Sequence, residues 1–139
     1  MEIGGFGDYV ADAAEKAGLR AYIGDMYRSG RWLTRDGSKM EYDWNEEAGI
    51  KGFHKAVDLI ERIDGRANGR IKGFLTPAQV DTCTEDLLRR SREASDRMPV
   101  PRAPHVRQSG FGVGAAGQPH GLTPAAWPRG GALQTQWTN

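Results

Sequence analysis

Apolar residues near the start of the chain first have the spacing of a helix and then form a short continuous run that is typical of a strand. Residues 7–19 place apolar side chains three or four apart, with Asp8 as the expected N-cap and Gly18 at the expected left-handed C-terminal position. Residues 19–27, LRAYIGDMY, are rich in apolar and aromatic side chains and predict a strand, with a loop beginning near Gly24 or Asp25.

The next stretch has neither a helical nor a strand period. Residues 28–44 are mostly polar but carry aromatic side chains, and they predict a long loop of the kind that often has a function. Together with Tyr27, the aromatic residues Trp32, Tyr42 and Trp44 bracket this loop. They could line a pocket for a flat ring, or they could simply cover the end of the strands.

A second helix and a second strand follow. The helix is predicted from Asn45 to Gly65, because one face carries an apolar stripe made of Ile50, Phe53, Ala56, Val57, Ile60 and Ile63. Residues 69–77, GRIKGFLTP, predict a strand that closes at Pro77, which cannot donate a hydrogen bond to a neighbouring strand.

The last pattern is a third helix and a weak strand. Residues 82–98 open with a capping-box spacing from Thr82 to Glu85, and their apolar face consists of Leu87, Leu88 and Ala94. Residues 100–106, VPRAPHV, predict at most a weak strand because the prolines remove hydrogen-bond donors. Alternation of helices and strands predicts an α/β fold with parallel strands and crossover helices.

Composition excludes several classes of partner. The chain has 139 residues and a formal net charge of +1, so no concentrated basic surface favours nucleic acid. No apolar run is long enough to cross a bilayer, and the N-terminus lacks the basic and apolar regions of a signal peptide. The single cysteine, Cys83, excludes an internal disulfide and a cysteine-based metal cluster. A cytoplasmic protein without nucleic-acid or membrane partners is expected.

The charges and prolines divide the chain in two. No Asp or Glu follows Asp96, whereas residues 97–139 contain four arginines and six of the seven prolines. Seven glycines lie between Gly110 and Gly131. We therefore expect a folded domain over residues 1–109 and a disordered or irregular Gly/Pro-rich tail over residues 110–139.

Three short motifs carry a resemblance to a known family. They are Gly18-Leu19-Arg20 before a strand, Pro77 followed by Thr82-Cys83-Thr84, and His105 followed by Gln108-Ser109. In this order and spacing the chain resembles the metal-dependent amidohydrolases, in the branch of chlorotriazine hydrolases, guanine deaminases and cytosine deaminase-like enzymes. The resemblance covers about residues 5–109 and resumes at residues 120–127, HGLTPAAW.

The resemblance implies a fold, a cofactor and a substrate class. The fold is a partial (β/α)8 TIM-type barrel, about strands two to five with their helices. The activity is hydrolysis of C–N or C–Cl bonds of ring compounds, or their deamination, by water activated on a divalent metal, zinc or iron. His105 corresponds to a metal ligand at the end of the fifth strand, and Tyr27 and Gln108 are expected to contact a small heterocyclic substrate.

The other ligands of that family have no counterpart in this sequence. Its His-x-His pair, a later histidine and an aspartate are all missing, and the only other histidines are His54 and His120. His54 fits a surface position on the second helix, and His120 fits a loop. We therefore expect an incomplete and inactive fragment whose own affinity for metal is weak.

Two alternatives belong to other classes. The chain could be a non-catalytic α/β module that forms homo-oligomers or binds a partner through exposed strand edges. It could also be a small nucleotide binder, since Gly112, Gly114 and Gly117 have a dinucleotide-binding spacing. That motif is disfavoured because a proline-broken stretch precedes it and no acidic residue follows to hold a ribose.

Overall fold

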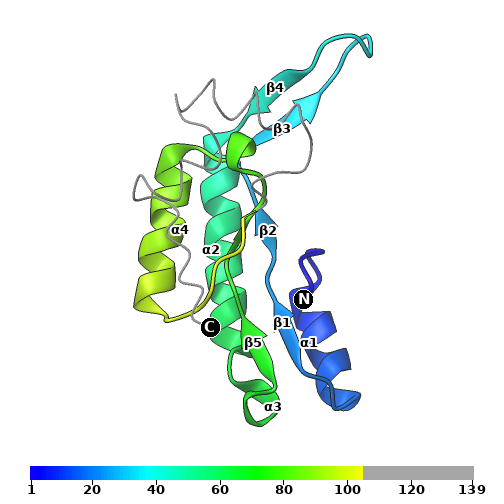
Figure 1. Cartoon of the computed structure of the whole chain (residues 1–139), viewed down its shortest axis with the longest axis vertical. Coiled ribbons are helices and arrows are strands. Elements are labelled where there is room, and N and C mark those ends of the chain that lie inside the picture. The colour runs from blue at the N-terminus through cyan, green and yellow to red at the C-terminus, as the bar shows by residue number, and fades with distance from the viewer. Residues whose placement is uncertain (105–139) are drawn as a thin grey trace.

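The structure is a computed structural model that describes residues 1–104. Figure 1 shows its helices and strands along the chain. In order they are α1 (Gly7–Lys16), β1 (Ala21–Ile23), β2 (Met26–Tyr27), β3 (Gly30–Leu33), β4 (Glu41–Trp44), α2 (Glu46–Ile63), α3 (Arg66–Gly69), β5 (Ile71–Gly73), β6 (Thr76–Pro77), the 3-10 turn η1 (Val80–Thr82) and α4 (Glu85–Arg97).

The two predicted strands lie side by side and run parallel. β1 pairs with β5, with Ala21 opposite Ile71, and β2 pairs with β6, with Met26 opposite Thr76. Each predicted strand is thus split into two short ones. The predicted α/β fold with parallel strands is confirmed, and the strands of residues 1–104 do not close into a barrel.

Single bridges extend this parallel arrangement on both sides. Glu2 bridges to Ile23 at one edge, and Arg102 bridges to Leu75 at the other. At the second edge the Leu75 N–H donates to the Pro101 carbonyl, and the Ala103 N–H donates to the Leu75 carbonyl, both at 2.9 Å. The weak strand predicted over residues 100–106 is therefore a single bridge in its described part, because Pro101 and Pro104 have no N–H to donate.

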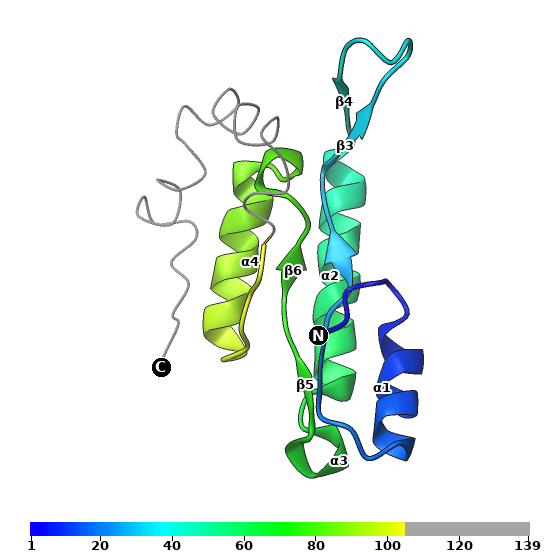
Figure 2. The same ribbon diagram turned by 45° about the vertical axis from the view of Figure 1, so that its right-hand side comes forward.

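Helices α1, α2 and α4 pack against the strands, as Figures 1 and 2 show. One core cluster joins Ile23 and Ile71 to side chains of α1 and α2, and a second joins Tyr27 and Leu75 to α2 and α4. Gly73 also faces α2, because a Cβ added there would lie 2.8 Å from Ile60 Cγ2. Since side chains alternate along a strand, the residues between these positions face away from α2.

Local signals placed α2 correctly. Asn45 is its N-cap, and the Asn45 side chain accepts a hydrogen bond from the Ala48 N–H at 2.8 Å. The helix ends at Ile63, and Gly65 then adopts a left-handed conformation with φ of +83°. Of the predicted stripe, Phe53, Ala56, Ile60 and Ile63 are buried, whereas Ile50 and Val57 are partly buried.

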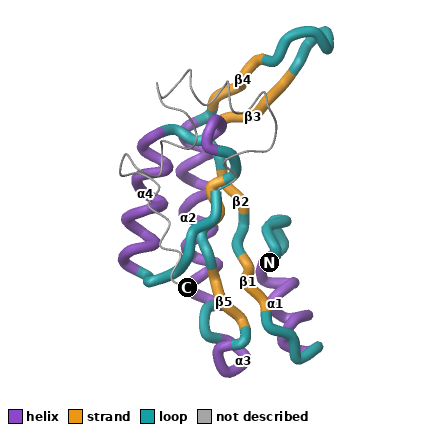
Figure 3. Tube along the Cα trace, viewed as in Figure 1, coloured by secondary structure: helices purple, strands orange, loops and turns teal. Residues whose placement is uncertain are grey.

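The prediction of a loop over residues 28–44 is wrong for residues 30–33 and 41–44, which form strands. β3 and β4 form an antiparallel hairpin there, with Trp32 opposite Tyr42 and Gly30 opposite Trp44. Each strand has only four residues, too few to reveal a period in the sequence. Figure 3 shows the hairpin extending beyond the start of α2.

Two predicted helix caps are also wrong. Asp8 lies inside the first turn of α1, where its carboxylate accepts hydrogen bonds from Arg62. Thr84, not Thr82, is the N-cap of α4, and its side chain accepts from the Leu87 N–H. Glu85 is the first residue of α4, and Thr82 belongs to the preceding turn η1, so the expected capping box does not form at this helix.

No helix within residues 1–104 has the length and apolar character needed to span a membrane.

Candidate functional site

The carboxyl ends of β2 and β6 lie on the same side of the molecule because these strands are parallel. The chain leaves β2 through Arg28 and Ser29 into the β3–β4 hairpin, and it leaves β6 toward η1. The Ser29 N–H donates to the Thr82 carbonyl at 2.9 Å and so joins the two connections. In parallel barrels the loops at this end of the strands form the active site, so this is where functional side chains are expected.

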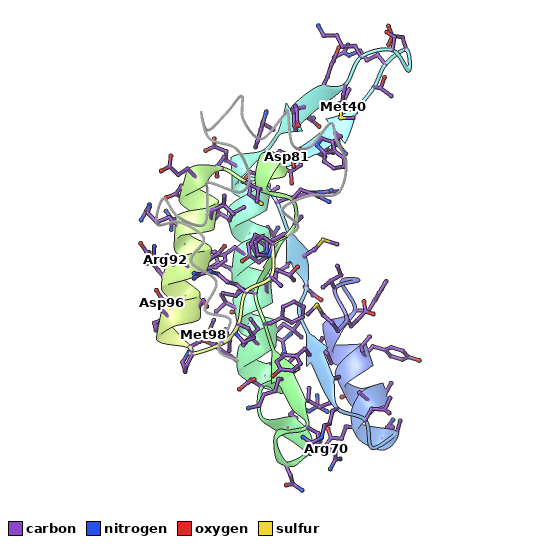
Figure 4. All side chains as sticks on the ribbon, in the orientation of Figure 1. Met40, Arg70, Asp81, Arg92, Asp96 and Met98 are labelled. Atoms are coloured by element: carbon purple, nitrogen blue, oxygen red, sulfur yellow. The ribbon has the colours of Figure 1, made fainter. Side chains whose placement is uncertain are left out.

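A buried carboxylate fixes the hairpin to this end of the fold. Asp81 in η1 is only 4% exposed, and its Oδ2 atom accepts hydrogen bonds from Trp32 Nε1 and from the Tyr42 hydroxyl, both at 2.8 Å. Burial and the hydrogen bond to Asp81 raise the pKa of Tyr42 to about 12, so this phenol stays protonated and remains a donor at neutral pH. Figure 4 shows Asp81 near the base of the hairpin.

The same contacts hold the exposed indole of Trp44. Tyr42 stacks against Trp44 with ring centroids 5.8 Å apart and planes 18° apart. Gly30 lies under the ring, since a Cβ added at Gly30 would come within 2.9 Å of Trp44 Cε3. Trp44 is still 42% exposed, so an aromatic surface is held in place with part of it open to ligands.

A pocket of about 370 Å³ opens beside Trp44, between the base of the hairpin and the start of α2. We call it the hairpin pocket. Its lining consists of Arg28, Ser29, Gly30, Arg31, Asp43, Trp44, Asn45 and Ala48. Arg31 pairs with Asp43 at 2.7 Å, whereas the exposed Arg28 has no ion pair or hydrogen bond within residues 1–104.

Tyr27 was predicted to contact a substrate, and the structure places its ring in the core. The hydroxyl donates to Ser91 Oγ at 2.7 Å, and the ring meets Phe53 edge-on at 5.5 Å. Burial raises the pKa of Tyr27 above its ordinary value. A direct substrate contact stays a prediction, and in this structure the hydroxyl points to α4. The alternation of side chains along a strand was the signal that could have predicted a buried Tyr27. Tyr27 is an even number of residues from Ile23, whose side chain faces the helices.

Cys83 lies in the core, and His54 lies on the surface of α2 as expected. Cys83 is buried, and burial raises the pKa of its thiol to about 12, so the thiol is neutral and a poor nucleophile at physiological pH. His54 is exposed on α2, with its ring 5.4 Å from that of Phe53. Sequence analysis missed Asp81, whose only signal was its position just before the Thr-Cys-Thr motif.

Residues 1–104 contain no group of three or more His, Cys, Asp or Glu side chains that could hold a metal ion. The predicted metal ligand His105 and the predicted substrate contact Gln108 lie outside the described residues, as does His120. The nearest described segment is the bridge of Arg102 to Leu75, which places residues 101–103 beside the strand that contains β5 and β6.

Comparison with known proteins shows two kinds of similarity. No family model matches the chain. A 5-methylthioadenosine/S-adenosylhomocysteine deaminase of Carboxydothermus hydrogenoformans is 29% identical over 119 residues, which make up 86% of this chain and 24% of the relative. A 5'-deoxyadenosine deaminase of Methanothermobacter thermautotrophicus is 30% identical over 120 residues, or 86% of this chain and 25% of that protein.

Solved structures match in fold. An adenosine deaminase from Xanthomonas campestris with bound zinc superimposes with a TM-score of 0.70 and 20% identity over 92% of this chain and 26% of that protein. A triazine hydrolase from Arthobacter aurescens gives a TM-score of 0.65 and 14% identity over 91% of this chain and 27% of the hydrolase. Over most of its length, this chain is similar to proteins of the amidohydrolase superfamily.

The family resemblance seen in the sequence is thereby confirmed. The chain spans about a quarter of the length of the curated relatives it matches. Its parallel strands and helices correspond to part of the barrel of those structures. Zinc is bound by the Xanthomonas deaminase, whereas residues 1–104 of this chain show no metal-binding cluster.

Proposed function

We propose that this chain supplies about strands two to five of an amidohydrolase barrel that hydrolyses C–N or C–Cl bonds of a ring compound, or deaminates it. The observation that supports this most is the Arg102–Leu75 bridge, which sets residues 101–103 beside β5 and β6 in parallel orientation. His105 follows Ala103 by two residues in the sequence. This fits a ligand at the end of the next barrel strand.

The proposed substrate is a small nitrogen heterocycle of the adenosine type. The relatives in sequence are named as deaminases of 5'-deoxyadenosine, 5-methylthioadenosine and S-adenosylhomocysteine, and one structural relative is a triazine hydrolase. Gln108 and Tyr27 are the proposed substrate contacts. Tyr27 would have to leave its hydrogen bond with Ser91 to reach a ligand.

The described residues do not fit a resident metal by themselves. A hydrolytic zinc or iron site needs several His or carboxylate ligands, and residues 1–104 bring no three of them together. We therefore assign no reaction step to this part of the chain. Its own contribution is to set the strand order and to fix the hairpin over the strand ends through Asp81.

We propose that the chain alone neither retains stoichiometric metal nor turns over substrate. Purified protein should be analysed for zinc and iron by mass spectrometry and assayed with adenosine, 5'-deoxyadenosine and a chlorotriazine. The expected result is trace metal, no turnover, and no change in metal content for His105→Ala. Stoichiometric metal that is lost in His105→Ala, together with turnover, would contradict the inactive-fragment part of the proposal.

A second candidate is a module that acts by self-association. Tyr22 and Met26 lie on the strand face that points away from α2, and they are 49% and 42% exposed. Exposed apolar surface of this kind favours association. Sedimentation velocity over a wide concentration range should then show oligomers that Met26→Lys dissociates. The matched control is Tyr9→Lys, which changes an exposed aromatic residue on α1. A wild-type monomer at all concentrations would exclude this candidate.

A further inference from the structure

We propose that the hairpin pocket binds a planar aromatic ring that carries an anionic group. The pocket has a volume of about 370 Å³, which lies within the range of roughly 300–1,000 Å³ typical of small-molecule sites. This proposal does not depend on the proposed hydrolytic function, because it uses no metal and none of the residues proposed to bind metal or substrate there.

The aromatic wall of the pocket is already in place. Trp44 is fixed between the stacked ring of Tyr42 and the backbone of Gly30. Tyr42 is in turn held by its hydrogen bond to the buried Asp81. A ligand ring that packs against the exposed part of Trp44 therefore costs the protein little side-chain entropy, and preorganisation of this kind favours binding.

The pocket also offers an arginine without an acidic partner. Arg31 is paired with Asp43 at 2.7 Å, so its charge is largely compensated within the pocket. Arg28 is exposed and makes no ion pair or hydrogen bond within residues 1–104. Its guanidinium can donate two parallel hydrogen bonds to a carboxylate or a phosphate, which is the geometry that arginine provides best.

Nearby acidic residues restrict how such a ligand can lie. Glu46 and Glu47 occupy the first turn of α2, next to the pocket but outside its lining. They would repel an anion placed near that turn. The anionic group must therefore lie beside Arg28, with the ring against Trp44. A simple phosphate has no ring and could make only the first of these two contacts.

Calorimetric titration of the full chain can test the ring and the anion separately. Adenosine 5'-monophosphate carries both groups, adenosine carries only the ring, and ribose 5-phosphate carries only the anion. Anthranilate tests an aromatic carboxylate in place of a nucleotide. The titrations contain EDTA, so that a failure of metal-dependent chemistry cannot be mistaken for a failure of this pocket.

We expect the monophosphate or anthranilate to bind about tenfold more tightly than adenosine and ribose 5-phosphate, since a charge-assisted hydrogen bond is added to the aromatic contact with Trp44. Whichever of the two binds more tightly identifies the source of the anion. Equal affinities for the monophosphate and adenosine would overturn the anionic part. Absence of binding by both anionic rings would overturn the whole proposal.

Variants then assign the contacts. Arg28→Gln and Trp44→Leu should each weaken binding of the anionic ring about tenfold, because each removes one of its two anchors. Arg35→Gln is the matched control, since Arg35 lies in the same hairpin but pairs with Glu41 outside the pocket. Unchanged affinity in Arg28→Gln, or an equal loss in Arg35→Gln, would contradict a specific role for Arg28.

Discussion

Trp32 Nε1 donates a hydrogen bond to Asp81 Oδ2 at 2.8 Å, across a separation of 49 residues in sequence. The Tyr42 hydroxyl donates to the same oxygen. Both aromatic residues belong to the hairpin, whereas Asp81 belongs to the turn after β6. This buried carboxylate therefore connects two segments that follow different strands.

Asp81→Asn should loosen the hairpin. The amide keeps one acceptor oxygen but loses the negative charge that strengthens both hydrogen bonds, so we expect a loss of about 1–3 kcal/mol of stability. Trypsin should cut faster after Arg35 and Lys39, which are exposed near the hairpin tip. Glu93→Gln, which removes an exposed carboxylate on α4, is the control. Equal cleavage rates in wild type and Asp81→Asn would show that Asp81 does not hold the hairpin.

Gly73→Ala should strain the contact between β5 and α2. The added Cβ would lie 2.8 Å from Ile60 Cγ2, and overpacking of this kind typically costs about 1–3 kcal/mol. Urea unfolding gives the free energies for a double-mutant cycle. Ile60→Ala in the Gly73→Ala background should cost less than in the wild type, because it removes Cγ1 and Cγ2, which the added Cβ would meet. Strictly additive effects would mean that the two side chains do not meet.

Ser91 and Tyr27 should be coupled in stability. Tyr27 donates to Ser91 Oγ at 2.7 Å, and Ser91 Oγ donates to the Leu87 carbonyl at 2.7 Å. Tyr27→Phe removes one buried hydrogen bond, with an expected cost of about 1 kcal/mol. In Ser91→Ala the Tyr27 hydroxyl loses its acceptor, so the further change Tyr27→Phe should then be neutral or stabilising. An undiminished cost in that background would contradict the hydrogen bond.

The thiol of Cys83 should make stability fall at alkaline pH. Its pKa rises from 9.0 to about 12 in the folded chain because the thiol is buried. Below pH 9.0 both folded and unfolded thiols are protonated, so the contribution is fully present; it is lost between 9.0 and about 12, where only the unfolded thiol ionises.

Chemical unfolding across this pH window measures the effect. The slope contributed by one thiol is at most about 1.4 kcal/mol per pH unit. Cys83→Ala should show a shallower fall than the wild type, while Tyr27 and Tyr42 remain as common contributors in both proteins. Parallel pH profiles would show that the Cys83 thiol ionises as easily in the folded chain as in the unfolded one.

Residues close in sequence determined much of the fold. The apolar stripe that includes Phe53 and Ile60, the Asn45 cap and the left-handed Gly65 defined α2, because helix hydrogen bonds and caps join neighbours along the chain. The alternation of helices with apolar strands likewise predicted parallel pairing, and the structure confirms it. The order and spacing of the three short motifs, rather than any one of them, predicted the resemblance to the amidohydrolases.

Tertiary structure decided the features that depend on distant partners. The hairpin of residues 30–44 exists through cross-strand pairs such as Trp32 with Tyr42, and its position depends on Asp81. No periodic pattern of apolar residues in the sequence indicates such contacts. Tyr27 illustrates the same limit, because nothing in the sequence indicated its contacts with Phe53 on α2 and Ser91 on α4, and its predicted substrate contact stays a prediction. Local hydrogen bonding and periodicity thus determine helices and strands, while the surroundings of a polar or aromatic side chain follow from which strand faces which helix.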